Sequence, residues 1–447
     1  MRHNFHPAPH VPAWQFKLRR CRNFERISLR AVATILLFGS CNHLEANGFR
    51  LVSQDALAAA RGEAFAATAD NPSAIHYNPA GISQLDGFHV RMGLYALHFE
   101  PTFKPPAGTV TTPFVTNRTH EITEQDVVAP QLYATYAAPE TPLTLGLGVY
   151  APHGASVEWP QDTGFRAVAV DGELTYLRVN PVASLEIRPG LSLAAGIMID
   201  NAETSQGQGL SRRTNTGDEF RFEGDAWTTG YNMGLLWQIN EQWSVGATYR
   251  SKSQLNFDGD TDIVQPPFQP AGTGAQMELE FPATWVMGVS YRPTERWNIE
   301  FNADYTEWSS IEATTIFQDV KPRSGVQQNI PVTLDWKNSW ILKFGATRQF
   351  QDGWRASAGY VFNENSVPSG FYSPLAADLD RHFFTAGIGR DWSHYSLDLA
   401  YQYGFAPTRT VTGSVTTSKP GNFAGQNADG KYDFESHALL LSFGVKF

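Results

Sequence analysis

Short polar turns alternate with longer loops along this chain, and the segments between them alternate apolar with polar residues. Each short turn carries Pro, Gly, Asn, Asp or Ser residues, which reverse a chain tightly. The turns lie at residues 139–142, 188–190, 240–242, 293–295, 351–353 and 393–394. The clearest strand follows the fourth turn, where every second residue from Trp297 to Tyr305 is apolar. A period of two gives a strand one apolar and one polar face. The pattern therefore predicts antiparallel strand pairs joined by tight turns.

Aromatic rings stand at both ends of the apolar rows, as with Trp243 and Tyr249 or Trp354 and Phe362. In tilted strands, rings about eight residues apart lie roughly 20 Å apart along a membrane normal, near the spacing of the two aromatic girdles of a membrane barrel. The sequence has no apolar run of the ~18 residues that a membrane-spanning helix needs. These features predict an all-β membrane protein and exclude a helical one.

Fourteen segments fit the pattern, an even number as expected for a bacterial barrel whose two ends share the periplasmic side. Their cores are 87–99, 127–137, 143–153, 173–187, 191–201, 219–239, 242–257, 275–292, 296–308, 336–350, 353–363, 381–392, 395–406 and 434–447. The alternation runs up to a terminal Phe447, an ending of the kind that the barrel-assembly machinery recognises. We expect a 14-stranded antiparallel transmembrane β-barrel over residues 87–447. It would be a monomer in the bacterial outer membrane, in contact with lipid and lipopolysaccharide.

Residues 1–46 are expected to be an export signal, because seven Lys or Arg residues precede the apolar stretch 31–38 and a cut is expected after Ala46. Its removal takes away seven basic and two acidic residues, which changes the formal net charge from −10 to −15 and makes nucleic acid an unexpected partner. Both cysteines, Cys21 and Cys41, leave with it. The alternative is a lipoprotein with Cys41 as the lipidated residue, which the poor lipobox at residues 38–40 disfavours.

Residues 47–86 show no strand alternation and are rich in Ala, Ser, Asn and Gly. Small residues with Pro and Gly allow compact, irregular packing inside a lumen, where water and lumen side chains satisfy the backbone. This composition predicts an N-terminal plug, or hatch, inside the barrel. A periplasmic extension is the alternative.

Several motifs recur in one known family: residues 47–51 at the expected mature start, Asn78-Pro79-Ala80 in the hatch, and residues 249–251, 305–309, 366–368 and 380–383. With them, residues 47–447 resemble the FadL family of outer-membrane long-chain fatty acid transporters, which includes relatives that admit aromatic hydrocarbons. The resemblance implies that Asn78, Pro79 and Ala80 belong to a hatch that closes the barrel. It also implies that the N-terminus, with Phe49 and Leu51, lies by an internal ligand site.

The resemblance further implies an inward kink in the third strand that opens the wall sideways into the membrane. Residues 150–154 are the expected place, because Pro152 and Gly154 disrupt strand pairing. A plain loop start at the same residues is the alternative.

A fatty acid gains about 0.8 kcal/mol for each methylene that leaves water, so its carrier needs an apolar passage and a cation for the carboxylate. Strand alternation places Lys337 and Arg381 in the lumen near its outer end, and the resemblance independently assigns head-group contacts to both. Arg166 in the second loop is a third candidate. The alternative is that these are ordinary lumen charges, paired with carboxylates such as Asp335 or Asp380.

An outer loop is expected to capture the ligand first, because Ile263, Val264 and Phe268 would expose an apolar patch there. With Leu210 of the third loop, this patch could form an external groove. Packing of the loop against its neighbour is the alternative.

Together these features predict passive uptake of long-chain fatty acids, or of another hydrophobic small molecule, by capture at outer loops, binding in the lumen and lateral release. The alternatives are a channel for aromatic or other neutral hydrocarbons, a general porin and an outer-membrane enzyme. The sequence has no G-x-S-x-G, H-E-x-x-H or C-x-x-C motif, so we expect no catalytic residue, no cofactor and no metal site.

Overall fold

The computed structural model describes residues 50–51, 53–112, 115–123, 126–210, 217–321, 327–415 and 426–447, all within the compact unit Gly39–Phe447. The strands are β1 (Phe88–Phe99), β2 (Thr102–Lys104), β3 (His120–Glu121), β4 (Asp126–Ala137), β5 (Leu143–Tyr150), β6 (Ala155–Glu158), β7 (Asp171–Arg188), β8 (Leu191–Gly209), β9 (Glu219–Gln238), β10 (Trp243–Arg250), β11 (Ser253–Val264), β12 (Ala271–Phe281), β13 (Thr284–Thr294), β14 (Trp297–Thr306), β15 (Ala313–Gln318), β16 (Asn329–Thr333), β17 (Ser339–Gln349), β18 (Trp354–Asn363), β19 (Arg381–Asp391), β20 (Tyr395–Val411) and β21 (Gly430–Lys446). The helical segments are α2 (Ala56–Ala60), α3 (Ala74–Tyr77), η1 (Pro79–Gln84), η2 (Trp308–Ser310), η3 (Gln351–Gly353) and η4 (Ser369–Phe371). None of these described helices is long and apolar enough to cross a membrane.

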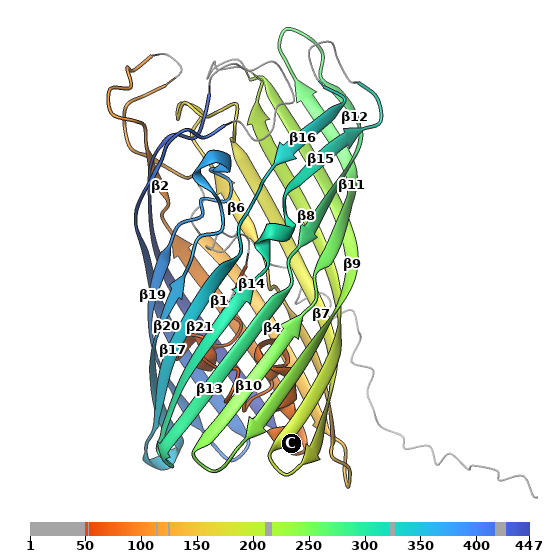
Figure 1. Ribbon diagram of the computed structural model, residues 1–447, viewed down its shortest axis with the longest axis vertical. Helices are drawn as coiled ribbons and strands as arrows, with labels where there is room; N and C mark the ends of the chain where they lie inside the picture. Colours follow the sequence, from red (N-terminus) through yellow and green to blue (C-terminus); the bar gives the residue numbers. More distant parts are fainter. Residues whose placement is uncertain are drawn as a thin grey trace, which may run out of the picture. The chain divides into compact units, whose positions relative to one another are not determined.

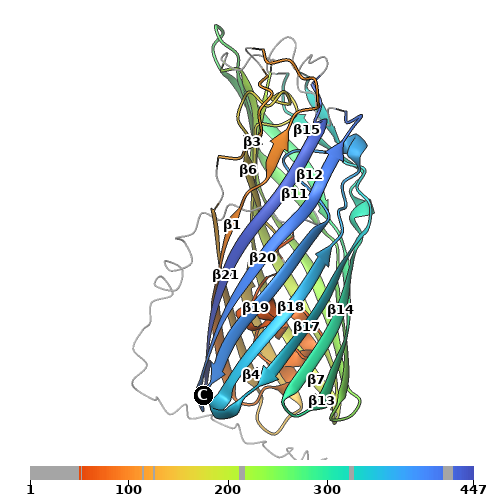
Figure 2. The same ribbon diagram turned by 90° about the vertical axis from the view of Figure 1, so that its left-hand side faces the viewer.

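The strands form one closed antiparallel barrel (Figures 1 and 2), because β1 pairs with β4 on one side and with β21 on the other. Some wall strands are divided by a short break into two consecutive strands, such as β5 and β6 or β10 and β11. Each divided pair counts as one barrel strand, and the barrel then has fourteen barrel strands. The predicted number of strands is confirmed, and each of the six predicted turns joins two neighbouring strands at one end of the barrel.

Several predicted boundaries are wrong. The predicted core 242–257 is interrupted between β10 and β11, and the core 275–292 is interrupted between β12 and β13 at Pro282 and Ala283. Proline has no N–H to give to a ladder, which explains the second break. The predicted loop at 309–335 contains the paired strands β15 and β16.

The lower part of the barrel, near the tight turns, has an apolar outer face and a polar lumen. In β14, Trp297 and Phe301 are exposed, whereas Glu300, Asn302 and Asp304 are buried inside. Outward rings form two levels, with Trp243 and Tyr291 at the lower one and Tyr249 and Trp285 at the upper one; their centroids are 4.4 and 4.3 Å apart. This is the arrangement expected of the two girdles that flank a membrane.

Above the upper girdle the polarity is reversed. The outward residues of β11 are polar, with Asn256, Asp258 and Asp260 among them, whereas its inward residues Leu255 and Phe257 are fully buried. Above the upper girdle, the outer face of the wall therefore suits contact with water, and its inner face suits contact with apolar groups. The switch coincides with the break at residues 251–252, where the alternation changes phase: the buried residues of β10 have even numbers and those of β11 have odd numbers.

The N-terminal segment 53–86 lies in the lower lumen and is drawn in red and orange in Figure 1. Its backbone and side chains bond to inward side chains from several walls, including Thr385, Glu300 and Ser192. Wall glycines allow a close approach: a Cβ at Gly345 would lie 1.9 Å from the Arg61 carbonyl oxygen, and one at Gly246 would lie 2.0 Å from that of Ala66. These wall positions therefore require glycine.

Candidate ligand passage

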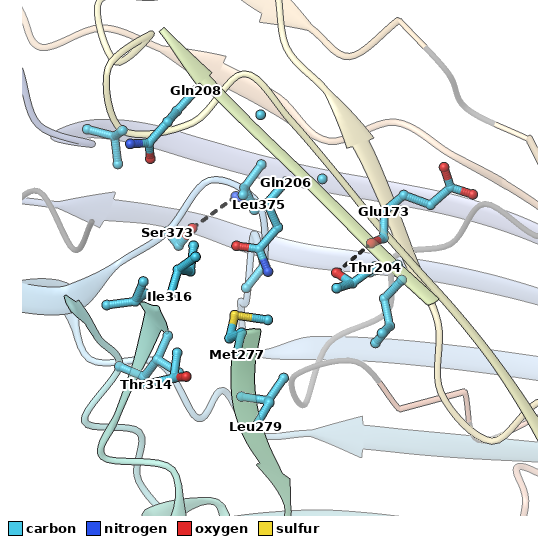
Figure 3. Close-up of a pocket in the computed structure, with 18 of the residues that line it drawn as sticks. Glu173, Thr204, Gln206, Gln208, Met277, Leu279, Thr314, Ile316, Ser373 and Leu375 are labelled. Carbon is cyan, nitrogen blue, oxygen red and sulfur yellow. Dashed lines mark hydrogen bonds between the residues drawn. The ribbon is translucent and has the colours of Figure 1, made fainter. Parts of the chain in front are cut away.

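The upper lumen contains an apolar cavity of about 1060 Å³ that is partly open to solvent. We call it the apolar cavity. Figure 3 shows Met277, Leu279, Ile316 and Leu375 pointing toward it. Its walls come from strands far apart in sequence, from the β15–β16 pair and from the inward loop that contains Leu375. A mainly apolar lining of this kind suits a largely hydrocarbon ligand.

No Lys or Arg is found among the described residues that line the apolar cavity. Glu173 contributes backbone there, and its carbonyl accepts a 3.0 Å hydrogen bond from Thr204, but its side chain is exposed and points away from the cavity (Figure 3). The remaining polar lining consists of uncharged hydroxyl and amide groups such as those of Gln206 and Gln208. The apolar cavity thus suits the tail of a ligand and provides no counter-ion for a carboxylate.

A cluster of three rings lies at the inner end of the apolar cavity. His153 lies 4.8 Å from both Tyr176 and Phe281, measured between ring centroids, and Tyr176 lies 5.4 Å from Phe281. We call these three residues the ring cluster. Each ring residue lies two positions from a residue that lines the apolar cavity. The pairs are His153 with Ala155, Tyr176 with Leu174, and Phe281 with Leu279. The ring cluster therefore separates the apolar cavity from the lumen below.

Below the rings lies a second, small pocket, which we call the cationic pocket. Three arginines line it: Arg50, Arg178 and Arg250. Arg178 forms a bidentate pair with Asp200, at 2.7 and 2.8 Å. Arg50 donates to Asp304 at 3.2 Å. Among the described residues, no carboxylate lies within ion-pair distance of Arg250.

Positive charge is in excess around the cationic pocket. Lys343 also pairs with Asp304, at 2.8 Å, so that carboxylate already serves two cations. Burial lowers the pKa of His76, which belongs to the N-terminal segment and lines the pocket, well below its usual range, and the four nearby cations Arg250, Lys343, Arg50 and Arg178 lower it further. His76 is therefore neutral and contributes ring N–H or lone-pair contacts without charge.

The third barrel strand is interrupted beside the cationic pocket. β5 ends at Tyr150 and β6 begins at Ala155, while Pro152 and Gly154 lie in the irregular stretch between them. On the neighbouring strand β4, the ladder with β5 runs only from Leu132 to Ala137, and no pairing with the third barrel strand is found for residues 126–131. The break at Pro152 and Gly154 falls within the residues expected for a kink.

The N-terminal segment fills part of this interruption. Arg50 forms an isolated antiparallel bridge with His153, and the Leu51 N–H donates to the Pro152 carbonyl at 2.9 Å. Leu51 is buried and lines the cationic pocket. Phe49, the other predicted contact of the N-terminus, lies outside the described residues.

Buried ion pairs attach the N-terminal segment to the wall beneath the pocket. Asp55, which caps α2, pairs with Arg91, and Arg91 also pairs with Asp398 at 2.8 Å. Glu300 accepts from the Ala67 N–H at 2.8 Å and lies 3.5 Å from Arg61. Unlike a loose extension, this segment forms buried ion pairs and hydrogen bonds with the lumen wall.

Asn78, Pro79 and Ala80 make a specific contact with β9. The Asn78 side-chain amide donates to the Ala66 carbonyl at 2.7 Å and to the Leu235 carbonyl at 2.9 Å, while its oxygen accepts from the Ala80 N–H. Pro79 begins η1, a position where a missing N–H costs nothing. The motif thus joins two turns of the N-terminal segment to one wall strand.

Replacing Glu300 with Ala should loosen the N-terminal segment. The change leaves Arg61 buried without its acid and removes the acceptor of the Ala67 N–H, a loss of about 3–5 kcal/mol for a broken buried pair. We expect limited proteolysis to cleave within residues 53–86 faster than in the wild type, while the folded barrel keeps its heat-modifiable gel mobility. Glu295→Ala, at an exposed position, is the matched control. Equal cleavage rates in the two variants would show that these contacts do not hold the segment.

The predicted head-group cations have different environments. Arg381 is fully buried, as the alternation predicted; its guanidinium carbon lies 3.8 Å from the Phe434 ring centroid, and it donates to the Ala377 carbonyl at 2.9 Å. Arg166 is buried and paired with Asp218 at 3.0 Å, which is the alternative considered for it. Neither residue lines the apolar cavity.

The inward orientation predicted for Lys337 is wrong. Lys337 is exposed and precedes β17, whereas its neighbour Trp336 is buried and lines the apolar cavity. Residues 334–338 lie outside the strands, and both Trp336 and Ser339 are buried, so the alternation changes phase between them and does not extend from β17 back to Lys337. Within β17 the predicted phase is confirmed, since Trp340, Leu342 and Phe344 are exposed.

The predicted capture patch is also wrong in part. Ile263 and Val264 belong to β11 and not to a loop, so they face opposite sides: Ile263 is fully buried in the lumen and Val264 is exposed outside. Only Phe268 lies in the connecting turn, where it is 63% exposed. Leu210 is buried at the end of β8 and packs in the main apolar core. The four side chains do not form one external groove.

Sequence reasoning missed the cationic pocket. The alternation through Tyr249 already placed Arg250 on the inward face, and the motif at residues 249–251 had been noted. The acids that pair with its neighbours, Asp200 and Asp304, lie on other strands, so the excess of charge is visible only in three dimensions. Among the described residues, no group of three or more His, Cys, Asp or Glu side chains is arranged to hold a metal ion.

Comparisons with known proteins agree with this architecture. Residues 40–447 match the family model described as outer membrane protein transport protein (OMPP1/FadL/TodX). The long-chain fatty acid transport protein of Escherichia coli (strain K12) is 24% identical over 323 residues, which cover 68% of this chain and 66% of that protein. The crystal structure of a Pseudomonas aeruginosa FadL homologue has a TM-score of 0.77 at 17% identity and covers 90% of this chain and 100% of that chain. The Pseudomonas putida toluene transporter TodX has a TM-score of 0.67 at 15% identity, with 89% and 99% covered.

Proposed function

The chain belongs to the OMPP1/FadL/TodX family of outer membrane transport proteins, and we propose that within this family it takes up long-chain fatty acids passively. The family is one of outer-membrane transporters for hydrophobic compounds. The observation that carries the proposal is the sequence of environments along the lumen: an apolar cavity above, a cationic pocket below it, and an interrupted wall beside that pocket.

The proposed route begins at the apolar cavity, where the hydrocarbon leaves water. A long tail gains about 0.8 kcal/mol per methylene there, and none of the described lining residues points a charged side chain into the cavity. Rotation of the ring cluster then admits the ligand to the level of the upper aromatic girdle. The ligand leaves sideways through the break at Pro152 and Gly154, so its tail passes from an apolar cavity to lipid.

The N-terminal segment is proposed to act as the hatch that makes the lateral route necessary. Its buried ion pairs, Asp55 with Arg91 and Arg61 with Glu300, hold it in the lower lumen, and opening them would expose several charges. A polar, filled lower lumen is no path for a hydrocarbon. Residues 1–46 remain proposed as the export signal that is removed before assembly.

A channel for neutral aromatic hydrocarbons is the second candidate function. The absence of Lys and Arg among the described residues that line the apolar cavity favours it, and the solved toluene transporter TodX has the same fold. The two candidates differ in whether a carboxylate is needed for tight binding.

The proposal is tested by uptake in a bacterial host that lacks its own outer-membrane fatty acid transporter. Cells that produce this protein should accumulate radiolabelled oleate well above cells with an empty vector, and toluene should compete weakly. Uptake of toluene without uptake of oleate would replace the first candidate by the second. Uptake of neither would reject both.

Deleting residues 47–53 should impair uptake. The deletion removes Arg50 and Leu51, which bridge to His153 and Pro152 beside the interrupted wall, so the cationic pocket loses one wall and one charge. We expect saturable oleate uptake to fall severalfold while the protein still reaches the membrane. Unchanged concentration dependence in the truncated protein would refute a role of the N-terminus.

A further inference from the structure

Arg250 is a buried cation without a paired acid among the residues that the structure describes. Its side chain is 8% exposed, and its Nε has no hydrogen-bond partner in the described part of the chain. The carboxylate of Asp304 interacts with Arg250 only at longer range and forms its ion pairs with Arg50 and Lys343. An isolated buried charge is costly unless an opposite charge joins it.

The environment of Arg250 has the composition of an anion site. The described charges that face it are three cations, Arg50, Arg178 and Lys343, and two acids, Asp200 and Asp304. With Arg250 included, the cations exceed the acids by two. His76 and His153 line the same pocket, and the buried Nδ1 of each has no partner among the described residues. Guanidinium and imidazole N–H groups suit a carboxylate.

The pocket is placed for an amphiphile and not for a small free anion. Leu174, Tyr176 and Arg178 are successive inward side chains of β7, so about 13 Å of strand separates the apolar cavity from the arginines. The break in the third barrel strand borders the pocket through Pro152 and His153. A ligand with its charged end at Arg250 can therefore keep its tail in the apolar cavity or direct it through the wall.

The depth of the cationic pocket in the membrane also favours an amphiphilic ligand. Arg250 directly follows Tyr249, whose ring lies 4.3 Å from that of Trp285 in the upper girdle. Aromatic girdles mark the interface where lipid head groups lie. A carboxylate bound there would stay at interfacial depth during sideways release, and only the tail would enter hydrocarbon.

We infer that the cationic pocket binds the carboxylate of the transported amphiphile, with Arg250 as its counter-ion and Arg50, Arg178 and His76 around it. This inference rests on the proposed uptake of fatty acids. It places the head group below the ring cluster, at residues other than Lys337, Arg381 and Arg166.

The test compares oleate with oleyl alcohol, which has the same chain and no charge, on the full mature protein in lipid nanodiscs. Arg250→Gln should weaken oleate binding by about tenfold or more, the loss expected for a hydrogen-bonded charge, and should leave oleyl alcohol binding unchanged. Arg250→Lys should restore part of the oleate affinity. Arg348→Gln, at an exposed position over Trp297 on the outer face, is the matched control.

Each other outcome counts against a stated claim. If Arg250→Gln changes neither ligand, the head-group assignment is wrong and the proposed uptake stands. Equal weakening of both ligands would make Arg250 a structural residue and overturn the assignment as well. If an excess of inorganic phosphate displaces oleate completely, the pocket is an inorganic anion site. If the wild type binds neither lipid, the proposed function itself fails.

Discussion

Closing the third barrel strand should abolish fatty acid uptake. Replacing residues 152–154 by Val-Thr-Val supplies the missing N–H of Pro152 and β-branched side chains, so β5 can continue into β6. Residues 126–131 of β4, which pair with β1 on their other side, would then gain a partner in the third barrel strand. We expect oleate uptake by cells to fall to the level of the empty vector, because the ligand loses its way into the bilayer.

The control for this variant must separate blockage from misfolding. Pro142→Thr, in the periplasmic turn between β4 and β5, makes a similar chemical change away from the break. Both variants should show heat-modifiable gel mobility, and the closed variant should still bind oleate in nanodiscs. Normal uptake by a folded, closed variant would mean that the ligand does not leave through this wall.

The second large effect is expected from a charge in the apolar cavity. Met277 is buried and points toward the middle of the cavity (Figure 3). Met277→Asp places a carboxylate there without a cation nearby, and burying an ion costs several kcal/mol. It also repels an anionic ligand. We expect uptake of oleate, and of toluene if it is carried, to fall by about a hundredfold.

Two controls sharpen this result. Gln276→Asp introduces the same charge at the preceding residue, which is exposed on the outer face of β12. This variant should leave uptake unchanged. Met277→Leu keeps volume and polarity and should change uptake little. Equal uptake by Met277→Asp and Gln276→Asp would show that the ligand does not pass through the apolar cavity.

The sequence predicted the wall better than the passage, for a physical reason. A strand on a membrane wall has a period of two over its whole length, and a tight turn needs particular residues, so fourteen strands and six turns were predictable. The alternation also showed the lipid face of β14 and β17. It failed at Lys337, because β17 begins only at Ser339 and the irregular residues before it do not keep the alternation of the strand.

The site depends on contacts between distant segments, which a single sequence does not show. Arg50 forms an ion pair with Asp304, and Arg178 forms one with Asp200. Only when these pairs are known is it apparent that Arg250 has no paired acid among the described residues. The predicted loop patch failed for a related reason. The chain remains a strand far above the membrane, so Ile263 faces an apolar lumen where a loop had been expected.

Photo-crosslinking in native-like membranes tests the lateral route most directly. A fatty acid with a diazirine near the end of its tail would be added to the folded protein in lipid bilayers, irradiated, and located by mass spectrometry of peptides. We predict cross-links to the apolar cavity and to residues 150–158 at the wall break, with none at residues 61–70 of the N-terminal segment. Strong labelling of residues 61–70, with none at the wall break, would contradict lateral release and indicate passage through the lower lumen.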